Sequence, residues 1–307
     1  MNVETHKLNQ SKTSAWLKAM RLRTLPLALA STITGVSLAA YFGAENWLVA
    51  MLTGLTTVLL QVNSNLANDY GDFLRGTDSD DRLGPVRALQ SGVLNSAEMK
   101  RAIVLFSILS FLSGCFLLYL APVGIMAKGV LLFAGVMAIY ASIKYTAGSN
   151  PYGYRGLGDV SVMVFFGILG VLGAFYIQTN TMPWSMILPA IGLGAFSAGV
   201  LNINNTRDRV SDIKAGKITL AVKLGAENAR RYQVLLMAVG ILCFVGYAIL
   251  NFKEWNDWIF SISLPLFSLI GYKVYSIQED AKLDPFLKLL ALSTFLLSAL
   301  VAIGVWL

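Results

Sequence analysis

Gln61, Asn65, Asn68 and Asp72 are spaced at three or four residues, so a helix places all four side chains on one face. They follow or overlap the end of the apolar stretch WLVAMLTGLTTVLLQV, and that helix is therefore expected to end in a polar stripe. Carboxylate and amide oxygens are the ligands that a hard cation prefers. The stripe predicts a site for a divalent cation at the end of an apolar helix.

A second polar stripe with a similar register occurs later in the chain, in the sequence NNTRDRVSD. Its members are Asn204, Asp208 and Asp212. The pair Asn204 and Asp208 matches the pair Asn68 and Asp72, since both members are displaced by the same number of positions. Closely spaced carboxylates repel one another unless a cation holds them, and Mg²⁺ binds one or two carboxylates together with phosphate oxygens of a substrate. Two such helix ends facing one another predict a Mg²⁺ site for a phosphorylated substrate.

Basic side chains accompany both stripes. Metal ions together with Arg and Lys are the groups with which proteins bind a diphosphate and stabilise it as it departs. Arg207 and Lys217 flank the second stripe. The residues that follow the first stripe are Arg75, Arg82 and Arg87. Arg21 and Arg23, which open the first apolar helix, either reach the same surface or anchor that helix at the membrane interface.

A third polar patch, IKYTAGSNPYGYRGLGDVSVMVFFG, joins two further apolar runs. Its polar members are Lys144, Tyr145, Tyr152, Tyr154, Arg155 and Asp159. Aromatic, phenolic and cationic groups together suit an aromatic acid as substrate. The tyrosines also fit an aromatic belt at a membrane interface. Asp159 fits that alternative less well, because it opens a helix that is otherwise hydrophobic.

The remaining acids of these loops have other interpretations. Asp80, Asp81 and Glu98 are interpreted as residues of a solvated loop. Asp69 and Asp78 fit either a metal site or a solvated loop.

Composition places the stripes in a membrane protein. The 307-residue chain has 13% charged residues and a mean hydropathy of +0.63, whereas a soluble domain has about a quarter charged residues. Nine apolar runs are long enough to cross a bilayer as helices. They span 22–43, 46–67, 101–121, 123–143, 158–178, 184–203, 232–251, 257–276 and 287–307. The sequence predicts one all-α, polytopic membrane domain over residues 1–307.

Basic residues are distributed unevenly between the connections. With nine spans and the N-terminus inside, all 24 Lys and Arg residues except Lys128 and Lys253 lie on the inner side. Because positive residues mark the cytoplasmic side, we expect the long connections 68–100 and 204–231, and with them the site, to face the cytoplasm from the cell membrane. The net charge of +7 is then a signal of topology and does not require nucleic-acid binding. Residues 1–15 are expected to form a flexible cytoplasmic tail.

Over essentially its full length the chain resembles the UbiA-type intramembrane prenyltransferases. That family has an Asn-Asp-x-x-Asp-like motif after its second helix and an Asp-x-x-x-Asp motif after its sixth. They correspond here to NDYGD (Asn68–Asp72) and DRVSD (Asp208–Asp212). Both motif regions and the third patch resemble the branch that prenylates 1,4-dihydroxy-2-naphthoate. The chain has Gly76 where the family often has another Asp, and Asp78 follows two residues later, so its metal role carries over less directly.

The resemblance implies a nine-helix bundle around a central cavity that opens laterally to lipid. It implies Mg²⁺, a polyprenyl diphosphate donor and a 1,4-dihydroxy-2-naphthoate acceptor, with demethylmenaquinone, carbon dioxide and diphosphate as products. The expected metal ligands are Asn68, Asp69, Asp72, Asp78, Asn204, Asp208 and Asp212. The expected substrate-binding residues are Arg23, Asn65, Arg155, Asp159, Arg207 and Lys217. The expected catalytic residues are Asp72, Asp208, Asp212, Lys144 and Tyr145.

Two alternatives remain at this stage. A transporter usually carries ionisable groups deep in its spans or broken helices near the membrane midplane, whereas the charges here collect at one surface. Within the enzyme class, 4-hydroxybenzoate, a haem ring or a chlorophyll-type ring are alternative acceptors.

Overall fold

The computed structural model of the chain describes residues 11–76 and 87–307, which are helical and contain no strand. The α-helices are α2 (Lys12–Met20), α3 (Leu25–Tyr41), α4 (Trp47–Leu74), α5 (Ser96–Leu120), α6 (Ile125–Lys144), α7 (Gly158–Val162), α8 (Ala174–Thr179), α9 (Ile187–Arg207), α10 (Arg209–Lys214), α11 (Leu220–Asn251), α12 (Leu264–Ser276) and α13 (Asp284–Trp306). The 3₁₀ segments are η1 (Leu22–Thr24), η2 (Tyr152–Arg155), η4 (Trp184–Met186), η5 (Asn256–Ser263) and η6 (Asp280–Leu283), and η3 (Met163–Gly173) is a π-helix.

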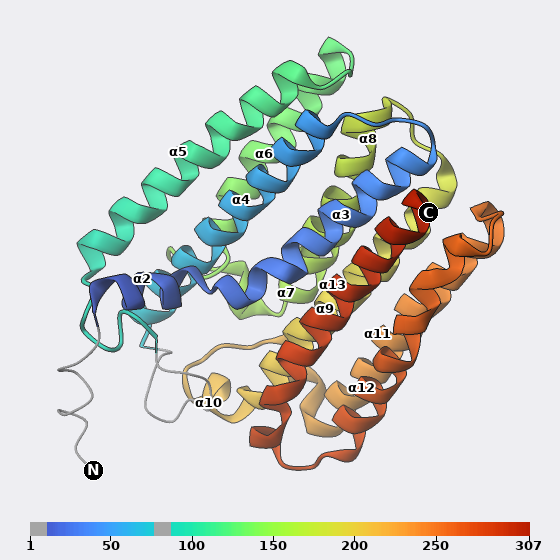
Figure 1. Cartoon of the computed structure of the whole chain (residues 1–307). Coiled ribbons are helices and arrows are strands. Elements are labelled where there is room, and N and C mark those ends of the chain that lie inside the picture. The colour runs from blue at the N-terminus through green and yellow to red at the C-terminus, as the bar shows by residue number, and fades with distance from the viewer. Residues whose placement is uncertain (1–10, 77–86) are drawn as a thin grey trace.

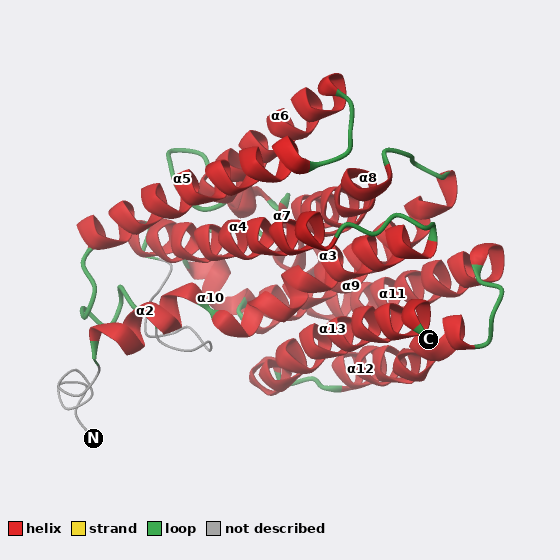
Figure 2. Cartoon of the chain, turned by 45° about the horizontal axis from the view of Figure 1, so that its top comes forward, coloured by secondary structure: helices red, strands yellow, loops and turns green. Residues whose placement is uncertain are grey.

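Within the described ranges, nine helical segments are long and apolar enough to cross a membrane. The long helices run side by side as one bundle (Figure 1), and loops join them at its two ends (Figure 2). This arrangement confirms the predicted all-α, nine-span architecture.

Some helices extend well beyond the apolar runs that predicted them. α11 begins at Leu220, although its apolar run begins at residue 232, and its backbone is kinked at Gly225, where φ is 77° and ψ is 171°. The added turns carry Arg230, whose guanidinium donates to the carbonyls of Ile277 and Gln278 at 2.8 and 3.0 Å. Hydropathy therefore locates the end of the apolar surface and not the end of the helix. The helical residues before position 232 are stabilised by hydrogen bonds such as those of Arg230.

The N-terminal helix α2 packs on α4 at one end of the bundle (Figure 1). It begins at Lys12, so residues 12–15 of the expected tail are helical. Lys12 Nζ lies 2.8 Å from a carboxylate oxygen of Glu98. Glu98 was expected in a solvated loop, but it lies in the first turn of α5, where it forms a capping box with Asn95.

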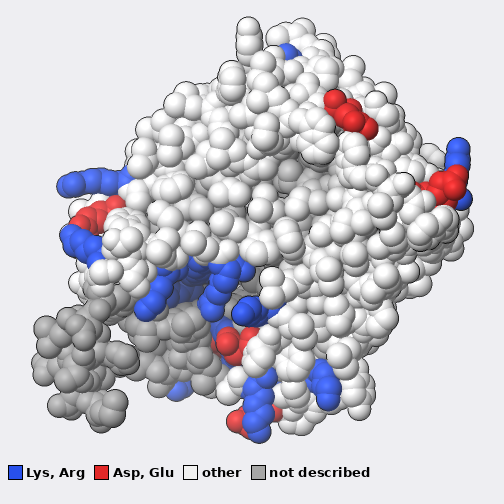
Figure 3. Space-filling model, viewed as in Figure 1, with Lys and Arg blue, Asp and Glu red and all other residues white. Residues whose placement is uncertain are grey.

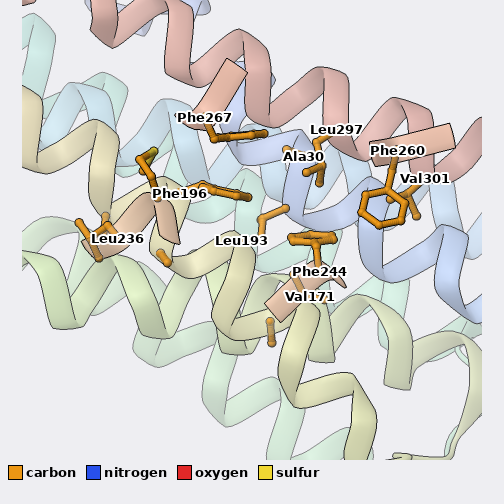
Figure 4. Packing of buried hydrophobic residues seen from close by; sticks show 14 of the residues in the cluster. Ala30, Val171, Leu193, Phe196, Leu236, Phe244, Phe260, Phe267, Leu297 and Val301 are labelled. Carbon is orange, nitrogen blue, oxygen red and sulfur yellow. The ribbon is translucent and has the colours of Figure 1, made fainter. Parts of the chain in front are cut away.

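An aromatic core fixes the position of α9 (Figure 4). The rings of Phe196 on α9 and Phe267 on α12 stack with their centroids 3.8 Å apart. On α11, Gly240 leaves room for this stack, since a Cβ there would lie 2.2 Å from Phe196 Cε1. Close packing of this kind prevents a buried helix from shifting or rotating. It therefore fixes the position of the polar C-terminal end of α9.

The fifth span is interrupted by the π-helix η3, where the sequence predicts one continuous helix over 158–178. Two glycines of η3 let neighbouring helices approach. A Cβ on Gly167 would lie 2.5 Å from the carbonyl oxygen of Ala190 on α9, and a Cβ on Gly170 would lie 2.7 Å from Ser31 Cβ on α3. The segment therefore packs between α3 and α9.

We predict that Gly240→Ala destabilises the protein by about 1–3 kcal/mol, because the new methyl group overlaps a ring that cannot shift. The measurement is the unfolding temperature in detergent. Gly246→Ala, on the same helix, is the matched control, because the nearest atom to its new Cβ is 3.8 Å away. Equal unfolding temperatures for the two variants would contradict the prediction.

Candidate active site at the polar end of the bundle

The ends of α4 and α9 meet at a polar cavity of about 1320 Å³. Asn68, Asp69 and Asp72 of α4 line it together with Asn204 and Arg207 of α9. On this face of the molecule Lys and Arg side chains gather around a hollow (Figure 3). The first stripe therefore reaches this cavity with Asn68 and Asp72, and the second stripe reaches it with Asn204.

Asp72 of the first stripe and its neighbour Asp69, which is grouped with that stripe from here on, are buried and paired with arginines. Asp69 pairs with Arg21 and with Arg87, whose Nη1 lies 3.1 Å from Asp69 Oδ1. The same nitrogen lies 2.8 Å from Asp72 Oδ2. The Tyr154 hydroxyl donates to Asp72 Oδ1 at 2.7 Å. These partners offset the cost of burying two carboxylates, each at most 3% exposed.

A glycine in the first stripe brings Tyr154 to Asp72. A Cβ on Gly71 would lie 2.4 Å from Thr146 Oγ1, so α4 packs directly against the connection from α6 to η2. The Thr146 hydroxyl donates to the carbonyl of Ala67 at 3.1 Å and pins this contact. Tyr154 lies on η2, immediately after this connection.

Asn65, expected to bind substrate, has its amide engaged in the scaffold. Its Nδ2 donates to the carbonyl of Met20 and to Thr24 Oγ1, both at 2.9 Å. These bonds fix the link between α2 and α3. That link carries Arg21 and Arg23, both of which line the polar cavity.

In the second stripe, Arg207 binds Asp208 through two parallel hydrogen bonds of 2.8 and 2.7 Å. Its guanidinium also donates to Asn204 Oδ1 at 3.0 Å and pairs with Asp284 of α13. Arg207 and Asp208 are at most 3% exposed, whereas the side chain of Asp284 is 49% exposed at the outer edge of this network. The cavity wall is formed by Arg207 and not by Asp208.

Asp212 completes the second stripe. Its Oδ1 lies 3.5 Å from Lys217 Nζ, while its buried Oδ2 accepts no hydrogen bond. Burial, together with the neighbouring carboxylates of Asp208 and Asp72, raises the pKa of Asp212 to about 6 despite the opposing effect of Lys217. The carboxylate thus lacks a full set of partners.

Tyr154 connects the two stripes. Its hydroxyl binds Asp72, and the ammonium of Lys217, the partner of Asp212, lies 5.6 Å from the centre of its ring. The sequence marks Tyr154 only as one tyrosine among several in the third patch. Its role depends on the fold of the α6–η2 connection. The role of Asp284 depends on its pairing with Arg207 across the bundle, and the sequence carries no signal for it.

The third patch is only partly brought to the cavity. Tyr145 lines it, and burial, followed by the carboxylate of Asp159, raises the pKa of its hydroxyl far above the usual range, so it stays protonated. Asp159 is buried beside the cavity without lining it. Lys144 lies 6.0 Å from the ring of Tyr140, and Arg155 is exposed; neither lines the cavity.

An apolar compartment of about 380 Å³ adjoins the polar cavity, since Asn68, Tyr145 and Phe166 line both. Its walls come from α4, α5, α6 and η3, and include Leu118 and Leu132. The site thus combines a charged chamber with a hydrocarbon-like one, which suits an amphiphilic molecule with an anionic head.

The donor atoms at the cavity fit a hard divalent cation. Oxygens of Asn68, Asp69 and Asp72 surround one arginine nitrogen. Asp212 does not line the cavity, and its buried Oδ2 accepts no hydrogen bond. In the described part of the chain, no three acidic, His or Cys side chains already converge on a metal position. Asp78, the remaining expected ligand, lies outside the described residues, as do Asp80 and Asp81.

Solved structures with the same fold include two archaeal homologues. The apo structure of a UbiA homologue from Aeropyrum pernix gives a TM-score of 0.70 at 16% identity, covering 92% of this chain and 98% of that one. A UbiA homologue from Archaeoglobus fulgidus, bound to DMAPP and Mg²⁺, gives a TM-score of 0.60 at 16% identity, covering 94% of this chain and 100% of that one. At this identity the likeness establishes the fold.

Sequence relatives are more similar. The 1,4-dihydroxy-2-naphthoate octaprenyltransferase of Haemophilus influenzae is 42% identical over 304 residues, which cover 98% of this chain and 99% of the relative. The model of the UbiA prenyltransferase family matches residues 28–303. The match extends from within α3 to the last turn of α13 and includes every residue expected to bind metal. The chain belongs to the UbiA prenyltransferase family.

Proposed function

We propose that this chain transfers a polyprenyl group from a polyprenyl diphosphate to 1,4-dihydroxy-2-naphthoate, with loss of carbon dioxide and diphosphate, and so forms the quinol form of demethylmenaquinone. The observation that carries this proposal is the 42% identity to a naphthoate octaprenyltransferase over nearly the whole of both chains. The adjoining charged and apolar compartments support it, since the donor has an anionic head and a hydrocarbon tail.

The donor binds across the two compartments. Its diphosphate lies in the polar cavity, within reach of Arg21, Arg23, Arg87, Arg207 and Lys217, all of which line it. Arg and Lys bind phosphate oxygens through charge-assisted hydrogen bonds. The isoprenoid tail lies in the apolar compartment, where contact with hydrocarbon side chains removes it from water.

Mg²⁺ is held by the two stripes. The residues that bind it are Asn68, Asp72, Asn204, Asp208 and Asp212, with Asp69 beside them. When bound, the metal supplies positive charge to the departing diphosphate oxygens. Tyr154 holds Asp72 in place through its hydroxyl, and Lys217 contacts the ring of Tyr154 from the second stripe. Tyr154 therefore holds the two stripes in a fixed arrangement around the metal.

Breaking the bond between the allylic carbon and the diphosphate oxygen leaves a carbocation at the boundary of the compartments. The apolar walls exclude water, which would otherwise capture the cation. The ring carbon that bears the carboxylate then forms the new carbon–carbon bond, and the electron pair released with carbon dioxide restores the ring. Tyr145 lines both compartments and keeps its proton, so its hydroxyl donates a hydrogen bond to an oxygen of the acceptor.

The cavity faces the cytoplasm. Basic residues cluster around its mouth, which is the pattern expected of the inner side of a cell membrane (Figure 3). The acceptor and Mg²⁺ reach the site from water on this side, and the donor reaches it from the bilayer. One multi-pass domain therefore binds a water-soluble acceptor and a lipid-soluble donor at the same site.

We expect the purified protein, in lipid with Mg²⁺ and a polyprenyl diphosphate, to prenylate 1,4-dihydroxy-2-naphthoate and release one carbon dioxide per product. The measurement is mass spectrometry of products from a panel of acceptors that includes 4-hydroxybenzoate and haem. Transfer to another acceptor with none to the naphthoate would refute the acceptor assignment.

We expect Asp72→Asn and Asp208→Asn each to lower kcat by about two orders of magnitude or more, because each removes a charged oxygen ligand from a site that stabilises the leaving group. Initial rates at saturating substrate measure this. Glu227→Gln is the control, since Glu227 is exposed on α11, where it pairs with Arg231 one turn further along the helix. Activity of either Asn variant equal to that of the control would show that its carboxylate is not a ligand.

A further inference from the structure

One nitrogen of Arg87 occupies a cation position built from oxygens of the first stripe. Nη1 lies 2.8 Å from Asp72 Oδ2, 3.1 Å from Asp69 Oδ1 and 3.4 Å from the carbonyl oxygen of Asn68. All three oxygens come from one turn of α4. These are carboxylate and carbonyl donors, the kinds of oxygen that bind Mg²⁺. The guanidinium of Arg87 therefore occupies a position, at the C-terminal end of α4, where three oxygen atoms favour a positive charge.

Each acid of the two stripes has a basic partner. The pairs are Asp69 with Arg21 and Arg87, Asp72 with Arg87, Asp208 with Arg207, and Asp212 with Lys217. A metal ion that arrives alone must displace a basic group and leave that group's charge close by. A diphosphate that arrives alone must draw a basic group away from a buried carboxylate. Each step is unfavourable by itself, because it leaves a buried charge without its partner.

We propose that Arg87 is a positioning residue that couples the binding of metal and diphosphate. It occupies the position among Asp69, Asp72 and Asn68 until a diphosphate draws the guanidinium away, and only then is that position available to the metal. The proposal rests on the proposed function in one respect, namely that the cavity binds a diphosphate. Because coupling is reciprocal, the metal also strengthens binding of the diphosphate.

The position of Arg87 fits this exchange. Its side chain lines the polar cavity, so the guanidinium reaches a diphosphate there by rotation about its own side-chain bonds. Asp69 keeps Arg21 as a second partner when Arg87 leaves. Asp72 keeps the hydroxyl of Tyr154. The remaining partners hold both carboxylates in place for the incoming ion.

A purely structural ion pair leads to the opposite expectation. If Arg87 only held α4 in place, its removal would disorder the oxygens and weaken metal binding. If Arg87 competes with the metal, its removal leaves two buried carboxylates without enough positive charge, and these bind a cation more strongly. The sign of the change in metal affinity therefore separates the two roles.

The test is a titration of the full-length protein in nanodiscs with Mn²⁺, followed by electron paramagnetic resonance, without and with inorganic pyrophosphate at matched free Mn²⁺. For the unmodified protein we expect pyrophosphate to raise Mn²⁺ affinity about tenfold or more. For Arg87→Ala we expect Mn²⁺ affinity without pyrophosphate to rise about tenfold, and the effect of pyrophosphate to fall below about twofold. Unchanged or weaker Mn²⁺ binding by Arg87→Ala overturns the proposal.

Two further variants control for folding and for net charge. Arg101→Ala removes one positive charge from the exposed surface of α5 and is expected to leave both Mn²⁺ affinities unchanged. Arg87→Lys retains the charge but lacks the planar guanidinium, so its Mn²⁺ affinity without pyrophosphate is expected to rise about threefold. Should Arg87→Ala fail to fold, the lysine variant decides: a rise supports the exchange, and no rise overturns it.

The result is separate from the proposed function. If the unmodified protein prenylates no naphthoate, the acceptor assignment fails, while the Mn²⁺ titrations still report whether Arg87 excludes the metal. If it prenylates the naphthoate but Arg87→Ala shows no gain in Mn²⁺ affinity, the coupling fails and the function stands.

Discussion

Pairing between buried carboxylates and basic side chains holds the polar end of this bundle together. Asp72 shares Arg87 with Asp69, and Asp208 is enclosed by Arg207. Unpaired, such charges would be costly at the edge of a membrane. Paired, they form a nearly neutral cluster whose partners face the cavity. In the proposed coupling, a metal and a diphosphate bind together, because each offsets the charge that the other displaces from these pairs.

The scaffold turns two distant helix ends into one site. The aromatic stack around Phe196 and Gly240 positions α9, and contact between Gly71 and Thr146 positions the end of α4. Tyr154 then joins the halves through Asp72 and Lys217. Beside them, η3 contributes a wall of the apolar compartment. A reaction of an amphiphilic donor requires a polar cavity and an apolar compartment side by side, because the diphosphate head and the hydrocarbon tail favour different surroundings.

Hydropathy predicts the nine spans and the spacing of polar residues predicts the two stripes, because both follow from periodicity along single helices. A site shared by the two stripes is predicted only from their matched spacing and from the family resemblance. Contacts between distant segments are not predicted in this way. Asn65 lies in the predicted stripe, yet its amide binds Met20 and Thr24. Arg155 belongs to a promising patch but faces outward. The π-helix depends on how closely α3 and α9 approach, and the roles of Tyr154 and Asp284 depend on partners far away in the chain.

A structure of the full chain with Mn²⁺ and a non-cleavable prenyl diphosphate analogue tests the central claim most directly, with the anomalous signal of Mn²⁺ locating the metal. We expect Mn²⁺ between Asp72 and Asp208, bound to oxygens of both helix ends and of the diphosphate, with the tail in the apolar compartment. Metal bound by only one stripe, or a diphosphate bound away from the polar cavity, would contradict a shared site.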